Sequence, residues 1–140
     1  MNNKFSKDLY RYYGEKGESF IKRLLRPTEL KYIALFRKAE NCKFKPLKLY
    51  YTVKLKLRSY KTHIQIPART KIGEGFYIGH SGRVIIHPEA ELGKNINVGT
   101  GATIGYEECG TTIGSKCVFC LVYLSKYSRG ACFFVRKNRV

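Results

Sequence analysis

Aliphatic residues recur at about every sixth position between residues 64 and 104, and a glycine usually follows them. The repeating pairs are Ile72-Gly73, Ile78-Gly79, Leu92-Gly93, Val98-Gly99 and Ile104-Gly105, with Ile113-Gly114 after a break. A helix buries residues about every 3.6 positions and a strand every second position, so a period of six marks a larger repeating unit. Each unit is expected to be one flat face of a coil, with an aliphatic side chain inside and a small residue at the corner. The pattern predicts a mainly β protein, a parallel β-helix built from hexapeptides.

The six-residue register breaks twice. Two sets of inward positions differ in phase by two residues: Ile66, Ile72, Ile78 and Val84, and then Ile86, Leu92, Val98 and Ile104. The slip between these sets falls in residues 78–86 and includes His80. The second break lies between Ile104 and Ile113, where nine residues replace six and predict a loop at 106–110. Insertions into a solenoid often supply its binding face, so both breaks are candidate functional positions.

The first 63 residues carry helical patterns and predict an α-helical N-terminal subdomain. Four apolar residues recur at helical spacing within 5–26, and Pro27 ends that run. Thr28 is expected to cap a second helix that reaches about Asn41. Residues 49–60 fit both a strand and a helix pattern. We favour a helix there, because helices can cover the open end of a solenoid.

These patterns divide the chain into three parts: a basic helical region at 1–63, a β-helix at 64–114 and a divergent tail at 115–140. After Gly114 the period of six stops, and residues 118–124 form a continuous apolar run. We therefore expect a C-terminal end that is truncated or divergent relative to a longer solenoid.

The net charge of +17 is concentrated outside the repeat. Residues 1–63 hold 17 Lys and Arg against 5 Asp and Glu, whereas residues 64–115 hold 4 against 5 and residues 116–140 hold 6 against none. A solvated basic surface is the interpretation we favour, and a peripheral membrane contact through the basic N-terminal region is the alternative. We expect no nucleic-acid binding, because no nucleic-acid-binding motif accompanies the charge.

Cysteine usage and the N-terminal sequence bear on location and metal binding. The chain has five cysteines, an odd number, and no signal-peptide pattern at its start, which predicts a cytoplasmic protein. Cys117 and Cys120 have the spacing of a metal-binding pair, but no second pair completes four ligands. We therefore expect free thiols and no metal site.

The segment from Ile64 to His80, IQIPARTKIGEGFYIGH, resembles the hexapeptide-repeat acetyltransferases and most closely the serine acetyltransferase group. The resemblance covers residues 64–114 and, more loosely, the helical N-terminus. It implies a left-handed parallel β-helix with an α-helical N-terminal part, assembled as a homotrimer. It also implies transfer of acetyl from acetyl-CoA to a hydroxyl acceptor, either the serine of cysteine biosynthesis or a sugar.

In the family that the chain resembles, the histidine matching His80 is the general base. Imidazole titrates near neutrality, so it can accept the proton of the attacking hydroxyl and return it to the leaving thiolate. Gln65 stands fifteen positions earlier, where the family has an aspartate that orients this histidine. Glutamine can orient the ring but cannot offset its charge. Some polysaccharide-modifying relatives have glutamine here, which leaves a polysaccharide or sugar O-acetyltransferase open as an alternative.

The resemblance also implies residues that bind the two substrates. Thr103 and Gly105 match the stretch that lines the acyl pocket, where a backbone N–H faces the developing oxyanion. His87 is either a substrate contact or a turn residue before Pro88. Tyr106 is the second expected substrate contact, in a loop that lacks the basic residues with which the family holds the acceptor carboxylate. An inactive or remnant scaffold without acetyl transfer is the remaining alternative.

Overall fold

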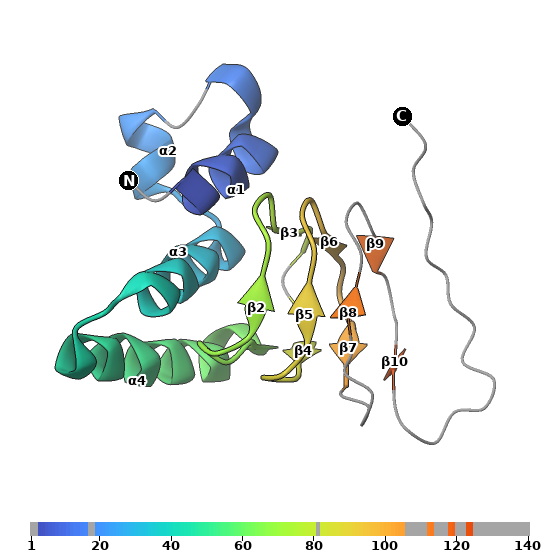
Figure 1. Ribbon diagram of the computed structural model, residues 1–140. Helices are drawn as coiled ribbons and strands as arrows, with labels where there is room; N and C mark the ends of the chain where they lie inside the picture. Colours follow the sequence, from blue (N-terminus) through green and yellow to red (C-terminus); the bar gives the residue numbers. More distant parts are fainter. Residues whose placement is uncertain are drawn as a thin grey trace.

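The N-terminal part of the chain is helical in the computed structural model, which describes residues 3–16, 19–80 and 82–105 and three further short strands at 112–113, 118–119 and 123–124. Its elements are α1 (Asn3–Tyr13), η1 (Gly14–Lys16), α2 (Phe20–Leu24), α3 (Thr28–Asn41) and α4 (Lys45–Thr62). The helices stand together at one end of a stack of short strands (Figure 1). The structure thus confirms the predicted helical N-terminal region and the helix favoured for residues 49–60.

Two details of the helices differ from the prediction. The single helical run expected at 5–26 is divided into α1, η1 and α2. Thr28 is the first residue of α3 and not its cap, because Pro27 takes the N-cap position and makes no side-chain hydrogen bond. Proline suits that position, since its fixed φ leads directly into a helix and the N–H that it lacks would have no helical partner there.

The described strands are short and follow one another closely along the chain. They are β1 (Ile64–Gln65), β2 (Lys71–Ile72), β3 (Tyr77–Ile78), β4 (Val84–Ile86), β5 (Glu91–Leu92), β6 (Asn97–Val98), β7 (Thr103–Ile104), β8 (Thr112–Ile113), β9 (Val118–Phe119) and β10 (Tyr123–Leu124). They pair in parallel to form three sheets, in the orders β1-β4-β7-β10, β2-β5-β8 and β3-β6-β9. Consecutive strands belong to different sheets, so the chain turns a corner after each strand. This arrangement is the parallel β-helix expected from the period of six.

The strand register confirms the two-residue slip and places it. Gln65 pairs with Ile85, twenty residues later, whereas Ile85 pairs with Thr103, eighteen residues later. From β1 to β7 the equivalent positions advance by six residues at each step except one, which is an advance of eight from Tyr77 in β3 to Ile85 in β4. The two additional residues therefore lie in the corner between β3 and β4, which includes His80.

Strand pairing continues beyond the predicted end of the repeat at Gly114. Thr112 and Ile113 pair with Glu91 and Leu92, which confirms a longer step in place of a regular hexapeptide before β8. Val118 in β9 then pairs with β6, and β10 pairs with β7. The apolar run at 118–124 thus contributes two strands to the stack, although the regular glycines that mark the earlier corners are missing from it.

The interior of the coil is filled by the aliphatic residues of the repeat. Their side chains are nearly closed to solvent and join one core with the inner faces of α3 and α4: Ile64, Ile66, Ile72, Ile78, Val84, Ile86, Leu92, Val98 and Ile104. Burying an aliphatic side chain of this size stabilises a fold by about 1.5–3 kcal/mol. Stacking of one aliphatic residue on the next is therefore what holds the coils together.

Two tyrosine hydroxyls from the helices complete the backbone hydrogen bonding of the first coil. Tyr32 in α3 donates to the carbonyl oxygen of Ile66 at 3.2 Å and accepts from the N–H of the same residue at 3.0 Å. Tyr12 in α1 forms the same pair of bonds with Ile78, at 2.8 and 3.1 Å. Each hydroxyl supplies the donor and the acceptor that a neighbouring strand would supply. Burial raises the pKa of Tyr32 to about 12 and also raises that of Tyr12.

A buried ion pair bonds to the backbone of the first coil between the positions that the two tyrosines contact. Nε of Arg37 lies 2.8 Å from Oδ2 of Asp8, and the guanidinium also donates to the carbonyl oxygens of Ile72 at 2.8 Å and Gly73 at 2.5 Å. Oδ1 of Asp8 accepts from the N–H of Phe76 at 2.8 Å. Burial works against the charge of Arg37, but the hydrogen bonds to its acidic partners outweigh this effect and raise its pKa. The helices therefore cap the first coil with specific polar contacts.

Candidate functional site

The corner between β3 and β4 holds His80, whose side chain is exposed. Gly82 in this corner packs against Thr100 in the corner of the next coil, and a Cβ atom at Gly82 would come within 2.4 Å of the Thr100 methyl group. A Cβ atom at Gly79 would meet nothing closer than 3.6 Å, so close packing does not require a glycine directly before His80. Contact between Gly82 and Thr100 thus holds one side of the corner against the next coil, and His80, on the other side of Gly82 in the sequence, is exposed to solvent.

Gln65 lies on the outer face of β1 and is exposed. It pairs with Ile85 in β4, which in turn pairs with Thr103 in β7. Successive residues of a strand point to opposite faces, and the residues next to these three are buried in the core. Gln65, Ile85 and Thr103 therefore form a column on the outer surface of one sheet. Two of the predicted site residues share this column.

A polar recess of about 530 Å³ lies over one end of this column and is lined by His63, Gln65, Arg83 and Ile85. His63 ends α4 in the left-handed conformation, with φ of 57°, and its carbonyl oxygen accepts from the N–H of Val84 at 3.1 Å. His63 precedes Gln65 by two residues, and Arg83 precedes Ile85 by the same interval. An imidazole, an amide and a guanidinium are therefore gathered next to the corner that carries His80.

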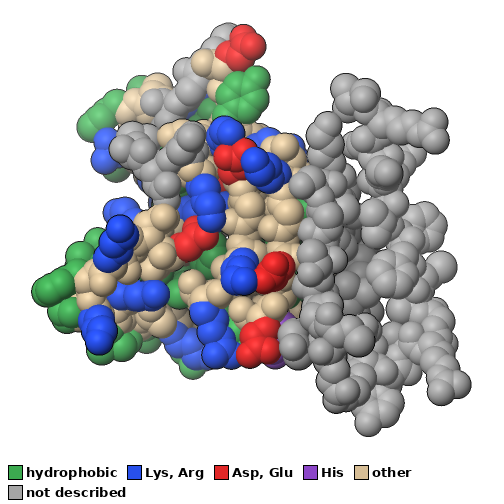
Figure 2. Space-filling view, viewed as in Figure 1, with side chains coloured by type: hydrophobic (Ala, Val, Ile, Leu, Met, Phe, Trp, Pro, Cys, Tyr) green, Lys and Arg blue, Asp and Glu red, His purple; other side chains and the backbone are tan. Residues whose placement is uncertain are grey.

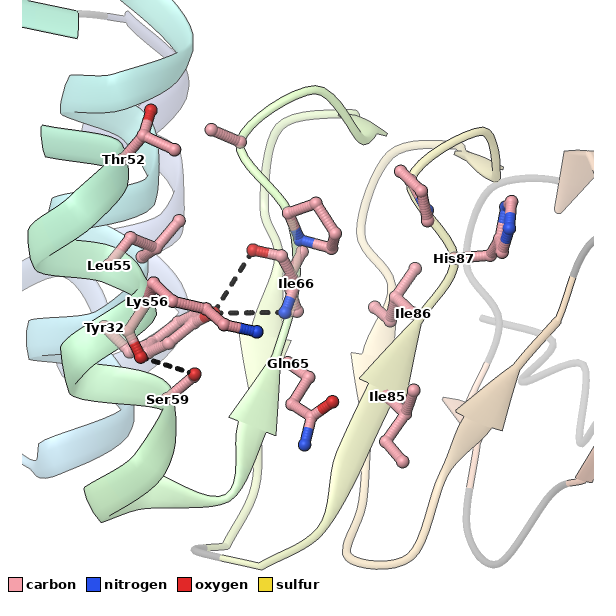
Figure 3. Close-up of a pocket in the computed structure, with 13 residues that line it drawn as sticks. Tyr32, Thr52, Leu55, Lys56, Ser59, Gln65, Ile66, Ile85, Ile86 and His87 are labelled. Carbon is pink, nitrogen blue, oxygen red and sulfur yellow. Dashed lines mark hydrogen bonds between the residues drawn. The ribbon is translucent and has the colours of Figure 1, made fainter. Parts of the chain in front are cut away.

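A second cavity of about 370 Å³ lies between α4 and the same sheet, with Gln65 and Ile85 again in its wall (Figure 3). The helix contributes Thr52, Leu55, Lys56 and Ser59, and the other walls come from Tyr32 and from the corners that follow β1 and β4. Most of the lining is apolar, and Lys56 and His87 are its basic side chains. Cavities of this size with a few polar groups are typical of small-molecule sites.

His87 lies in the corner after β4, half-buried, and lines the cavity beside α4. Its Nδ1 atom accepts from the N–H of Glu89 at 3.3 Å, and its carbonyl oxygen accepts from the N–H of Ala90 at 3.1 Å. These are the bonds of a tight turn around Pro88. The structure gives His87 the expected turn geometry and also places one edge of it at a cavity.

The remaining predicted site residues lie apart from the histidine corner. Thr103 is half-buried in β7, at the top of the column that Gln65 begins, and Gly105 directly follows β7. Tyr106, Cys117 and Cys120 lie outside the described residues. Within the described chain no hydrogen bond joins Gln65 to His80, and His80 does not line either of the two cavities that Gln65 lines. The contact expected between these two side chains therefore stays a prediction.

The break in the repeat pointed to His80 and the family resemblance pointed to Gln65, but neither pointed to His63 or Arg83. The signal for both was their spacing, because each lies two positions before a residue of the outer column, Gln65 or Ile85. Shifting the sequence by the twenty residues of the first coil also places Arg83 next to His63. The two residues could thus have been found once the slip was counted as part of one coil.

No protein-family model and no curated protein sequence matches this chain. Solved serine acetyltransferases have a similar structure. Isoform 3 from Entamoeba histolytica, in complex with cysteine, is 23% identical with a TM-score of 0.62, over 82% of this chain and 44% of that enzyme. Serine acetyltransferase 1 from the same organism, in complex with L-cysteine, is 19% identical with a TM-score of 0.56, over 79% of this chain and 47% of that enzyme.

A third solved structure, a serine acetyltransferase in complex with CoA, is 19% identical with a TM-score of 0.52, over 74% of this chain and 44% of that enzyme. The chain thus spans less than half the length of these enzymes. At such identities the likeness establishes a shared architecture of N-terminal helices followed by stacked parallel strands. From its structure, this chain has the fold of the serine acetyltransferases.

Proposed function

We propose that this chain is an acetyl-CoA-dependent O-acetyltransferase of the serine acetyltransferase type, with His80 as its general base. The observation that carries the proposal is the corner between β3 and β4. Between β1 and β7 it alone departs from the six-residue repeat, by two residues, and it presents an exposed histidine beside a recess lined by polar side chains. The fold shared with serine acetyltransferases supports the same function.

The proposed reaction needs a base because a neutral hydroxyl is a poor nucleophile toward a thioester. The imidazole of His80 takes the hydroxyl proton as the acceptor oxygen attacks the acetyl carbon, and it then returns the proton to the leaving thiolate of CoA. A solvent-facing position suits this role, because the two substrates must reach the ring and leave again. Serine and sugar hydroxyls both remain candidate acceptors.

Gln65 is proposed as the residue that orients the base. Its amide oxygen can accept a hydrogen bond from the imidazole N–H and so hold one tautomer, as a carboxylate does in other acid–base sites. It lies on the adjacent strand pair, exposed and close to the residues that follow the histidine corner. A neutral amide leaves the imidazolium charge uncompensated, which predicts a slower base than a carboxylate would give.

The acetyl group is proposed to lie over the outer face of the sheet that carries Thr103 and Gly105. Backbone N–H groups there would stabilise the developing oxyanion without reorganising during the reaction. The proposal extends to the left-handed sense of the coil, a homotrimeric assembly, a cytoplasmic location and a role of His87 and Tyr106 at the acceptor. Sedimentation velocity of the purified chain tests the trimer directly.

The test is a thiol-release assay with acetyl-CoA and either serine or simple sugars as acceptors. His80→Ala and His80→Gln are expected to lower the turnover number by about 10² to 10⁴, because a positioned base contributes that much. Glu89→Gln, in the exposed corner after β4, serves as the matched control and is expected to leave turnover unchanged. Urea unfolding of each variant checks that the fold is retained.

Two outcomes would contradict the proposal. Turnover by His80→Ala equal to that of the wild type removes His80 as the base. If His63→Asn then abolishes turnover, the histidine of the polar recess is the base instead; asparagine tolerates the left-handed backbone at this position. Absence of thiol release with every acceptor, together with absence of CoA binding by calorimetry, removes acetyl transfer altogether.

A further inference from the structure

The outward face of α4 carries a stripe of apolar side chains that no described part of the chain covers. Tyr50, Val53, Leu57 and Tyr60 recur at helical spacing, and each exposes at least half of its surface. The opposite face of the helix, with Leu55, Ser59 and Thr62, packs against the fold. With 3.6 residues per turn, the two faces lie on opposite sides of the helix. α4 therefore packs one face against the fold and directs an apolar stripe away from it.

Basic residues line both sides of this outer stripe. The 18 residues of α4 include six Lys or Arg and no Asp or Glu. By helical position, Lys45 and Lys56 lie along one side of the stripe, and Lys54 and Lys61 lie along the other. In Figure 2 hydrophobic side chains gather at the edge of the molecule formed by α4, with Lys and Arg side chains beside them. The outer face thus has an apolar centre and a cationic rim.

The aromatic residues of the stripe lie in contact with the cations of the rim. The ammonium group of Lys54 is 5.5 Å from the ring centroid of Tyr50, and that of Lys56 is 5.5 Å from the ring centroid of Tyr60. The aliphatic stems of these lysines therefore run along the helix surface, with the charged groups beside the rings. Lysine and tyrosine take up this arrangement where an apolar layer meets a polar one.

We propose that the outward face of α4 docks on a membrane surface that contains anionic lipids. An interfacial helix lies in the plane of the surface with its apolar stripe among the acyl chains and its lysines among the headgroups. None of the described helices is long and apolar enough to cross a bilayer, so the contact is peripheral. This surface is separate from the proposed catalytic corner, and its function is to hold the protein near a membrane.

Charge complementarity favours an anionic lipid surface over two other partners of this face, a second copy of the chain and a nucleic acid. A second copy of the chain would bring an identical cationic rim against the first, and like charges across an interface oppose association. A nucleic acid would satisfy the lysines through its phosphates but would leave Val53 and Leu57 without an apolar partner. An anionic lipid surface satisfies the rim and the stripe together.

The experiment is vesicle sedimentation of the full chain with phosphatidylcholine alone and with phosphatidylcholine mixed with phosphatidylserine. Binding is expected to the mixed vesicles and to weaken as salt is raised, because salt screens the lysines from the headgroups. Lys54→Gln with Lys61→Gln should lower the partition coefficient about 30-fold, since each Lys near an anionic surface contributes about fivefold. Val53→Asp with Leu57→Asp should abolish binding.

The matched control is Lys71→Gln with Lys94→Gln, which removes the same charge from exposed positions on β2 and after β5. It is expected to change the partition coefficient less than about twofold, because these lysines are not part of the docking face. Equal binding to both kinds of vesicle, or a control that loses as much as the α4 variant, would overturn the proposal. So would self-association in sedimentation velocity that is lost in Val53→Asp while vesicle binding persists.

Discussion

The helical cap and the histidine corner lie in neighbouring parts of one coil but use polar residues in opposite ways. In the cap, Tyr32 and the Arg37–Asp8 pair are buried and Tyr12 is partly buried, and each is bonded to backbone atoms of the first coil. In the corner, His80 is exposed to solvent, and so is Gln65 on the outer face of β1. Polar groups of the first kind determine stability and those of the second kind are available to a substrate. Variants in the two regions should therefore affect different measurements.

The largest expected effect is on stability, from Arg37→Met in the cap. The substitution leaves the carboxylate of Asp8 buried without its cation and removes donors from two carbonyl oxygens of the first coil. Breaking a buried ion pair in this way costs about 3–5 kcal/mol. The free energy of unfolding from urea titration measures it, with Lys38→Met on the exposed side of α3 as the control. A loss below about 1 kcal/mol would show that the pair does not hold the cap.

Tyr32→Phe should have the next largest effect, again on stability alone. It leaves the buried N–H and carbonyl of Ile66 without their partner, which costs about 1–3 kcal/mol. Tyr60→Phe removes a hydroxyl from an exposed tyrosine and should change stability by less than about 0.5 kcal/mol. Equal losses in the two variants would mean that the Tyr32 hydroxyl does not replace a strand.

Alkaline pH should weaken the cap through the same hydroxyl. The pKa of Tyr32 is about 12 in the folded protein against 10 for an ordinary tyrosine. Between these values the unfolded chain binds fewer protons than the folded one, so stability is complete below pH 10 and falls as pH rises toward 12. Over this pH interval the free energy of unfolding of the wild type should fall by about 2 kcal/mol more than that of Tyr32→Phe. Urea titration at each pH measures it. Parallel loss in both proteins would contradict the assignment.

In the histidine corner the expected effect is on turnover. Gln65→Asp introduces a carboxylate that can stabilise the imidazolium of His80, and it should raise the turnover number about tenfold in the thiol-release assay. Because the residue is exposed, the free energy of unfolding should stay within about 0.5 kcal/mol of the wild type. If Gln65→Asp leaves turnover unchanged, residue 65 does not orient His80.

The smallest effect is expected from an ion pair on the outside of the coil. Nζ of Lys71 lies 2.5 Å from Oε1 of Glu91 across β2 and β5, and both side chains are about half exposed or more. Lys71→Gln should cost less than about 1 kcal/mol, because solvent and salt screen such pairs. A larger loss of unfolding free energy would show that ion pairs on the outer face of the coil stabilise the fold as the buried contacts of the cap do.

The repeat could be predicted in detail because it depends on local spacing. One aliphatic residue per six fixes the inward position of each strand, and the break in phase at 78–86 corresponds to the longer corner in the structure. The apolar run at 118–124 is compatible with a buried strand, but continuation of the coil through β9 and β10 was not predicted, because this segment lacks the glycines that mark corners elsewhere. Local pattern thus predicts a coil only where each corner leaves a signal in the sequence.

The cap contacts could not be predicted in the same way. Tyr32 and Ile66 are 34 residues apart, and Asp8 and Phe76 are 68 apart. A tyrosine or an aspartate on a helix has many alternative partners, and the docking angle of the helix selects among them. The recess beside the histidine corner is intermediate: His63 and Arg83 meet only after the first coil has closed, but a shift of the sequence by the twenty residues of that coil aligns them.

The tyrosine hydroxyls of the cap also bear on the order in which the chain folds. A strand of a solenoid needs a neighbour to pair with, and each later coil finds that neighbour in the coil before it. Tyr12 and Tyr32 provide the first coil with a substitute for one. Because the N-terminal helices leave the ribosome first, a template for the first strands exists before those strands are synthesised. We therefore expect the coils to form one after another during translation, from the helical end outward.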